Sequence, residues 1–255
     1  MSSIEQAVAL KIAAAQATSI PGDIGANVQR HVQFMRRAIE LGVQFLVFPE
    51  LSLTGYESSL AHDLAIEVSD ARLAPLRELA KESGMVTVVG APLRGEGGKV
   101  LIAACIFDGA GQLSVYTKQH LHAGEELTFS PGPGGAVLAL GADRLAMAVC
   151  ADFSEPDHAR QAVLAGAGLY IASVLITDSG YKTDSAILSG YAAQHGMAVL
   201  MANHGGATGG WQSAGRSAFW AQDGSLVGAA SGGGDLLLLA ERDARGWSTQ
   251  TIDLA

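Results

Sequence analysis

The chain has 255 residues, of which 49% are hydrophobic and only 16% are charged, and its formal net charge is −9. This composition argues against a nucleic-acid partner, because phosphate binding needs a basic face, and no apolar run approaches the roughly 20 uncharged residues of a membrane span. The first residues lack the basic and apolar regions of a signal peptide, and two cysteines form no disulfide framework. We therefore expect a cytoplasmic protein with no membrane and no nucleic-acid partner.

Apolar runs and helix signals alternate along the chain. Helices are expected at positions where apolar residues recur with helical spacing or where capping signals occur: from Asp23 to Gly42, over 71–83, over 155–165 and over 183–195. Strands are expected where short apolar runs end at turn residues: at 7–15, 43–48, 85–89, 100–107, 112–116, 135–140, 144–149, 169–174, 198–202, near 225–228 and at 235–239.

This order predicts an α/β fold. Strands and helices alternate but are interrupted by hairpins, such as the one around 108–111. That pattern favours mixed sheets with helices outside over a purely parallel sheet. We find no repeat and no break in composition, so residues 1–255 are expected to form one domain. The apolar excess further predicts a homodimer or a larger homo-oligomer, because a monomer would expose large apolar patches.

Cys150 stands at a position that suits a nucleophile. The apolar run 144–149 reads as a buried strand, and Ser154, Pro156 and Asp157 follow as signals for a helix start. A thiolate at such a strand end would meet backbone N–H groups and the positive end of a helix dipole. The alternative is a buried cysteine that acts as a small hydrophobic residue.

Two further charged residues follow predicted strands. Glu50 ends the apolar run 45–48, where desolvation raises the pKa of a carboxylate toward that of a general base. Lys118 closes the hairpin strand, and Glu125 and Glu126 come soon after it. Each residue alone has a structural explanation, as a cap or a surface charge. Together they permit one cluster of base, cation and nucleophile.

At these residues the chain resembles the nitrilase superfamily of carbon–nitrogen hydrolases. The matching segments occur in the family's order and spacing: 48–56 (Phe-Pro-Glu-Leu-Ser-Leu-Thr-Gly-Tyr), 116–121 (Tyr-Thr-Lys-Gln-His-Leu), 124–132 and 149–152 (Val-Cys-Ala-Asp). The resemblance implies a four-layer α-β-β-α sandwich in which two mixed sheets pack face to face with helices outside. It also implies a triad of Glu50, Lys118 and Cys150, with Glu125 as a second acidic residue, and assembly into oligomers.

The resemblance implies hydrolysis of an amide or N-carbamoyl group of a small molecule, with no cofactor and no metal. Glu50 would act as base, Cys150 would form a thioester, and Lys118 with the Ala151 N–H would hold the oxyanion. Many relatives carry a bulky aromatic after the cysteine, and true nitrilases commonly carry Trp-Glu, whereas this chain has Ala151-Asp152. The sequence therefore favours amides over nitriles.

Substrate contacts are predicted by position only. Tyr56, Ala151, Ser173 and Val174 are expected to bind substrate, with further contacts from the rest of 173–181 and the Asn203 region. Arg216 is either a bidentate ligand for a substrate carboxylate or part of a structural ion pair. Asp152 is likewise either functional or structural. Aliphatic amides, ω-amides of dicarboxylic acids and N-carbamoyl compounds all stay open as substrates.

Two other functions fit parts of the sequence. His120 and His122 lie on one side of an extended segment near Glu125 and Glu126, as in a metal-dependent hydrolase. The remaining histidines supply no matching second set of ligands. A non-catalytic binding protein of the same fold is the other alternative, against which the presence of all three triad residue types argues.

Overall fold

Two mixed β-sheets form the centre of the molecule. The computed structural model describes residues 9–254. The first sheet has seven strands in the order β15-β14-β1-β2-β3-β4-β5, in which β2 pairs in parallel with β1 and β3 and the other pairs are antiparallel. Its strands are β1 (Leu10–Gln16), β2 (Phe45–Val47), β3 (Val86–Arg94), β4 (Val100–Phe107), β5 (Leu113–Thr117), β14 (Leu236–Asp243) and β15 (Gly246–Asp253).

The second sheet has six strands in the order β13-β12-β9-β8-β7-β6. Strands β7, β8 and β9 are parallel, and the outer pairs are antiparallel. Its strands are β6 (Leu138–Leu140), β7 (Asp143–Val149), β8 (Leu169–Val174), β9 (Ala198–Asn203), β12 (Ala218–Trp220) and β13 (Leu226–Ala229). A separate two-stranded ribbon consists of β10 (Ala207–Thr208) and β11 (Trp211–Gln212).

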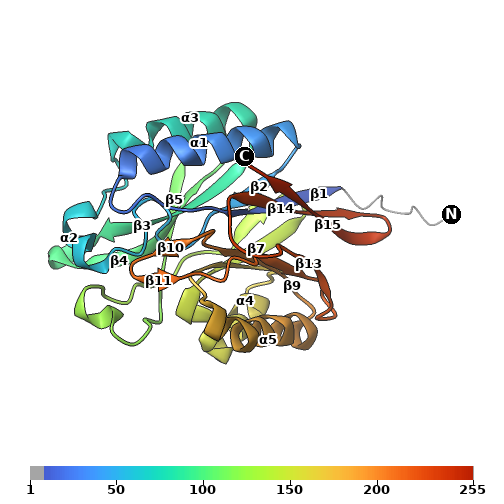
Figure 1. The fold of residues 1–255 in the computed structure, drawn as a ribbon. Coiled ribbons are helices and arrows are strands. Elements are labelled where there is room, and N and C mark those ends of the chain that lie inside the picture. Colours follow the sequence, from blue (N-terminus) through green and yellow to red (C-terminus); the bar gives the residue numbers. More distant parts are fainter. Residues whose placement is uncertain (1–8, 255) are drawn as a thin grey trace.

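Helices cover the outer faces of both sheets (Figure 1). The first sheet is covered by α1 (Ile24–Glu40) and α3 (Ala74–Ser83), and the second by α4 (Pro156–Leu164) and α5 (Asp178–His195). The Asp23 side chain caps α1 by accepting from the Ala26 N–H at 2.9 Å. Shorter helical segments lie in the loops: α2 (Ala61–Leu64) and the 3-10 turns η1 (Ser58–Leu60), η2 (Ala71–Leu73), η3 (Glu96–Gly98), η4 (Glu125–Leu127) and η5 (Cys150–Ser154).

The core has three parts that follow from strand alternation. Ile12 and Val47 of one sheet share an interior cluster with Met147 and Ile171 of the other. The alternate residues of the same strands, such as Ala13, face the helices instead. The apolar strands thus bury both faces, which confirms the predicted α-β-β-α sandwich.

The structure differs from the sequence analysis at three places. The helix after Cys150 is not capped by Ser154: a 3-10 turn begins at Cys150 itself, and Glu155 precedes α4 without a side-chain cap. The helix predicted over 183–195 begins at Asp178. Strand β15 was not predicted, because its sequence is polar and it lies at a sheet edge with exposed alternate residues. Residues 7 and 8 of the first predicted strand lie outside the described residues.

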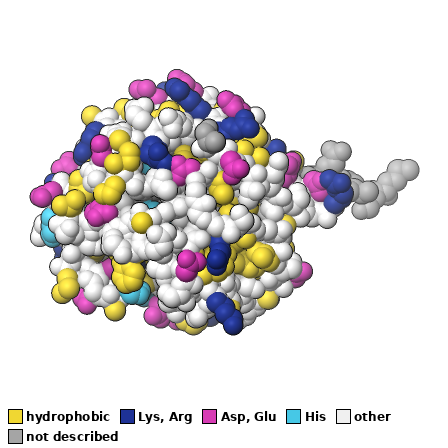
Figure 2. Space-filling model, viewed as in Figure 1, with side chains coloured by type: hydrophobic (Ala, Val, Ile, Leu, Met, Phe, Trp, Pro, Cys, Tyr) yellow, Lys and Arg dark blue, Asp and Glu magenta, His cyan; other side chains and the backbone are white. Residues whose placement is uncertain are grey.

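Charged side chains are dispersed over the face of the molecule shown in Figure 2, where no run of basic side chains gathers. Among residues 9–254, no helix combines the length and the apolar character that crossing a bilayer requires.

Strand β3 packs unusually close to the loop that follows β2. A Cβ atom on Gly90 would lie 2.3 Å from the Leu51 nitrogen and 2.5 Å from the Pro49 carbonyl oxygen. Leu51 itself has a φ of 52°, in the left-handed region. Only glycine at position 90 therefore leaves room for the backbone around Glu50.

We predict that Gly90→Ala lowers the free energy of unfolding by about 1–3 kcal/mol, since the added methyl group overpacks a rigid backbone contact. Gly190→Ala is the control: a Cβ on this helical glycine has no heavy atom within 4 Å, so it should be neutral or stabilising. Denaturant unfolding of both variants measures the difference. A Gly90→Ala protein as stable as the wild type would contradict the close contact.

Candidate active site

Cys150 stands at the point where β7 ends and η5 begins. Its φ is 43°, which places a residue other than glycine in the left-handed region and costs about 1–3 kcal/mol. The sulfur faces the Leu175 carbonyl oxygen at 3.8 Å. The buried strand up to Val149 holds the residue in place, and the strained turn directs its side chain into a cavity.

Glu50 lies in the loop after β2 and is 1% exposed. One carboxylate oxygen, Oε1, accepts from the Lys118 ammonium at 2.7 Å. The other, Oε2, is buried and has no hydrogen-bond partner among the described residues. The Nε2 of His204 lies 2.7 Å from the Glu50 carbonyl oxygen, and burial lowers the pKa of His204 to about 4. The imidazole is therefore neutral and donates to this carbonyl.

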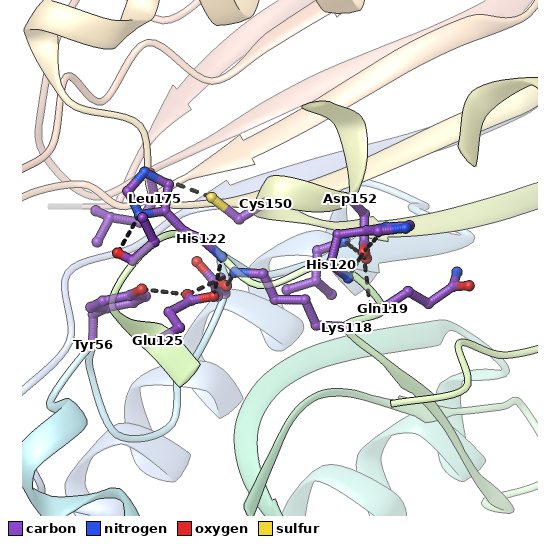
Figure 3. Close-up of polar contacts among 12 residues, drawn as sticks. Tyr56, Lys118, Gln119, His120, His122, Glu125, Cys150, Asp152 and Leu175 are labelled. Carbon is purple, nitrogen blue, oxygen red and sulfur yellow. Dashed lines mark hydrogen bonds and ion pairs between the residues drawn. The ribbon is translucent and has the colours of Figure 1, made fainter. Parts of the chain in front are cut away.

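Lys118 joins two carboxylates. Its ammonium donates to Glu50 Oε1 and to Glu125 Oε1, each at 2.7 Å, and all three side chains are buried. Glu125 is held in turn by the Tyr56 hydroxyl, which donates to Oε1, and by the His122 N–H, which donates to Oε2 at 2.7 Å. Figure 3 shows Tyr56, Glu125 and Lys118 pointing toward one another beside Cys150.

Burial and charge together set the proton affinities of the cluster. Burial raises the pKa of Glu50 to about 7, although the charge and the hydrogen bond of Lys118 lower it. Burial alone lowers the pKa of Lys118, but the charges of Glu50, Cys150 and Glu125 outweigh it and raise the pKa above its usual range. Burial and the Glu50 charge raise the pKa of Cys150. The resting site therefore holds a thiol, a lysine cation and a carboxylate that titrates near neutrality.

Asp152 links the turn that carries Cys150 to the segment that carries Lys118. Its buried carboxylate accepts from the Gln119 and His120 N–H groups, both at 2.9 Å, and from the Val149 N–H at 3.0 Å. The Tyr116 hydroxyl donates to it at 2.7 Å. Since these donors come from both segments, Asp152 fixes the position of Cys150 relative to Lys118. The contacts of Asp152 are therefore structural ones, and they hold two segments of the candidate site together.

A cavity of about 630 Å³ opens beside Cys150. Of the residues predicted as site residues, Glu50, Tyr56, Glu125, Cys150 and Ala151 line it. Lys118 is not among the lining residues; it is 1% exposed, and its ammonium is bonded to two carboxylates that are.

Ser173 and Val174 do not line this cavity. The Ser173 hydroxyl donates to the Phe48 carbonyl oxygen at 2.8 Å and so ties the two sheets together. Val174 points to the opposite face of β8 and packs in the cluster beneath the helices. Since β8 continues to Val174, the cavity wall begins one residue later, with Leu175, Ile176 and Thr177.

Asn203 and Arg216 also lie outside the lining. The Asn203 side chain is hydrogen-bonded at 2.9 Å to both the N–H and the carbonyl of Ile176, and so braces the cavity wall from behind. The Arg216 guanidinium pairs with Asp178 at 3.5 Å and lies 5.4 Å from the centre of the Tyr181 ring. Of the two roles that the sequence left open for Arg216, these contacts therefore support the structural ion pair.

Sequence reasoning missed several of the residues that line the cavity. Thr183, Asp184 and Trp211 are among them, and His122, which the sequence offered as a metal ligand, also lines the cavity. Isolated polar residues on a helix or a loop carry no local signal for such a position. Only the packing of α5 and the β10–β11 ribbon near Cys150 brings them there.

The two histidines considered as metal ligands are directed apart. His120 Nδ1 contacts Asp152 Oδ1 at 3.2 Å, and His122 lines the cavity. Across residues 9–254, no group of three or more His, Cys, Asp or Glu side chains is placed to hold a metal ion.

The fold is similar to that of solved structures of known proteins. The chain is similar in structure to the amidase from Nesterenkonia sp. AN1. A mutant of that amidase with acrylamide added at its active-site cysteine has a TM-score of 0.82 and 28% identity, over 90% of this chain and 92% of that chain. Another mutant of it, in complex with butyramide, has a TM-score of 0.84 and 28% identity, over 92% of this chain and 91% of that chain.

Two curated sequences are also similar. A Pseudomonas protegens protein named hydrolase in pqqF 5′ region is 31% identical over 167 residues, which cover 64% of this chain and 58% of that protein. A Pyrococcus abyssi nitrilase is 27% identical over 146 residues, 55% of each chain. The matches thus span little more than half the length of these two relatives. The profile of the carbon-nitrogen hydrolase family matches residues 11–249, and the chain belongs to that family.

Proposed function

We propose that this protein hydrolyses the carbon–nitrogen bond of a small linear amide through a thioester on Cys150. The observation that carries the proposal is the Lys118 ammonium, held at 2.7 Å from both Glu50 and Glu125, two carboxylates that line the same cavity as Cys150. The similar Nesterenkonia amidase supports it, since its active-site cysteine adds acrylamide in one structure and a mutant of it is in complex with butyramide in another.

In the first step, Glu50 Oε2 accepts the Cys150 proton as the sulfur attacks the amide carbon. This oxygen suits the role because it is buried and has no other partner in the described part of the chain. A carboxyl with a pKa of about 7 is close to the optimum for a base at neutral pH. The C–S bond forms, and the carbonyl oxygen becomes an oxyanion.

Lys118 and the Ala151 N–H stabilise this oxyanion. An ammonium group has three donors, and two of those of Lys118 go to carboxylates, which leaves one for the substrate. Ala151 is the second residue of η5, and the first N–H groups of a helical turn have no partner within the turn. Each such donor is worth about 3–4 kcal/mol in other hydrolases.

In the second step, the C–N bond breaks and the leaving amine takes the proton from Glu50. Water then attacks the thioester and gives its proton to Glu50, the C–S bond breaks, and the acid leaves as the thiol re-forms. Glu125 holds Lys118 in position throughout. The residues supply the nucleophile, the base and the oxyanion donors, so the proposed reaction involves no cofactor.

The cellular location and the oligomeric state of the enzyme are proposals as well. Both cysteines are free, which suits a reducing cytoplasm. The low charged fraction of 16% and the 49% of hydrophobic residues support a homodimer or larger homo-oligomer.

The primary test is ammonia release from butyramide. We expect Cys150→Ala to abolish turnover, because no other group can form the thioester, and Cys105→Ala to retain it. Cys105 is the matched control: it is 0% exposed in the core, and burial raises its pKa to about 12. In the wild type, iodoacetamide should label Cys150 before Cys105. Turnover by Cys150→Ala would overturn the proposal.

Glu50→Gln should reduce kcat by at least about 10²-fold, since the general base is lost. In the wild type, kcat/KM should rise with pH up to about 7 and then level off, because Glu50 must be ionised and its pKa is about 7. The pH–rate profile with a good amide measures this. Glu126→Gln, at the exposed neighbouring glutamate, is the control. A Glu50→Gln enzyme with near wild-type kcat would rule out Glu50 as the base.

Lys118→Arg separates an oxyanion donor from a structural charge. If Lys118 donates to the oxyanion, a planar guanidinium cannot occupy the same point, and kcat should fall about 10²–10³-fold. The exposed Lys81→Arg change on α3 is the control. Measuring kcat beside a melting curve shows whether the fold is kept. Wild-type turnover by a folded Lys118→Arg protein would require another cation for this role.

A further inference from the structure

The charged groups that line the cavity are almost all acidic. Glu50, Glu125 and Asp184 contribute carboxylates, and His122 is the single side chain of the lining that can become positive. Neither lysine nor arginine belongs to the lining within the described residues. Away from the Lys118 cluster, the charge that a ligand in this cavity meets is therefore mainly negative.

Lys118 and Arg216 both already have acidic partners. Lys118 is buried and is bonded to two carboxylates. Arg216 pairs with Asp178 at 3.5 Å and packs over the Tyr181 ring, outside the cavity lining. Neither guanidinium nor ammonium is therefore placed to receive a carboxylate on the acyl chain of a substrate.

Asp184 is the acidic group that faces the cavity without a cation of its own. It lies on α5 and is half-buried, and none of the salt bridges within 4.0 Å in residues 9–254 involves it. Burial raises the pKa of Asp184, while the charge of His122 lowers it. The half-exposed Trp211 lines the same cavity, and an indole face attracts cations as well.

We propose that the cavity selects amides whose acyl group is neutral or cationic and discriminates against those that bear a carboxylate, with Asp184 as the residue that sets this preference. The inference rests on the proposed amidase function and deepens it. Of the substrates left open by the sequence, it favours aliphatic amides over ω-amides of dicarboxylic acids and over N-carbamoyl amino acids.

The physical reason is desolvation without compensation. A substrate carboxylate that enters the cavity loses water and gains no cationic partner, so its burial is unfavourable. It also meets Asp184, and like charges oppose each other. Discrimination of this kind arises from a repulsive element in the site as much as from attractive contacts. An ammonium group at the same place would instead gain a partner.

Three amides of matched length test the proposal: 4-aminobutanamide, butyramide and succinamate, which are cationic, neutral and anionic at neutral pH. We expect kcat/KM to fall in this order, with the cation at least about tenfold above the anion. The difference should lie mainly in KM, because the charged group is remote from the reacting carbon. It should shrink as salt is raised from about 0.02 to about 0.5 M, since salt screens exposed charges.

Variants assign the preference to one residue. Asp184→Asn should lower the ratio of kcat/KM for cation over anion by roughly two- to fivefold, the range of a single partly exposed ion pair, and Asp184→Lys should invert the preference. Glu82→Gln on α3 removes the same unit of net charge on the far side of the first sheet and should leave the ratio unchanged. Melting curves confirm that each variant is folded.

Equal use of succinamate and butyramide by the wild type, or a ratio unaffected in both Asp184 variants, would overturn the inference. Calorimetric binding of the three amides to Cys150→Ala separates it from the proposed function. Binding in the expected order without any turnover by the wild type would refute the hydrolase and keep the selectivity. Turnover of all three amides with equal efficiency would keep the hydrolase and refute the selectivity.

Discussion

The contact on which the site depends is the buried ammonium of Lys118 between two carboxylates. A lone charge at this depth is strongly unfavourable, whereas a cation hydrogen-bonded to Glu50 and Glu125 at 2.7 Å regains much of the lost solvation. Because the three residues come from the loop after β2, the end of β5 and η4, the ion pairs also join these segments. The same cluster engages one carboxylate oxygen of Glu50 and leaves the other without a partner in the described residues. The ion pairs that join these segments therefore also leave one Glu50 oxygen available for the proposed reaction.

The sandwich gives this cluster a rigid frame. Ser173 ties β8 to the loop before Glu50, Gly90 lets β3 approach the Glu50 backbone, and Asp152 ties the Cys150 turn to the Lys118 segment. Each contact joins elements that are remote in sequence, and together they leave Cys150 little freedom. Positioning of this kind is what converts ordinary residue types into a reactive set. The strained φ of Cys150 persists because the buried residues Val149 and Asp152, which are hydrogen-bonded to each other, hold the turn.

Most of the fold followed from local patterns. Apolar runs such as 43–48 and 169–174 predicted buried strands, and the helical spacing of Val28, Val32 and Met35 predicted α1, because burial on one or both faces leaves a clear period. The Ser154 cap was wrong for a physical reason. The Asp152 side chain accepts from the Val149 N–H and turns the chain at Cys150. Ser154 therefore belongs to the 3-10 turn that begins at Cys150 and does not cap the next helix.

The sequence by itself determined which residue types stand at the strand ends: a glutamate, a lysine and a cysteine after buried runs, in an order that resembles one family. Their distances, and the other residues that line the cavity, were decided only by tertiary structure. The alternation of β8 turned Ser173 toward the other sheet and Val174 toward the helices, and the packing of α5 brought Asp184 to the cavity. Such positions depend on contacts between segments far apart in the chain, and these contacts produce no periodic pattern in the sequence.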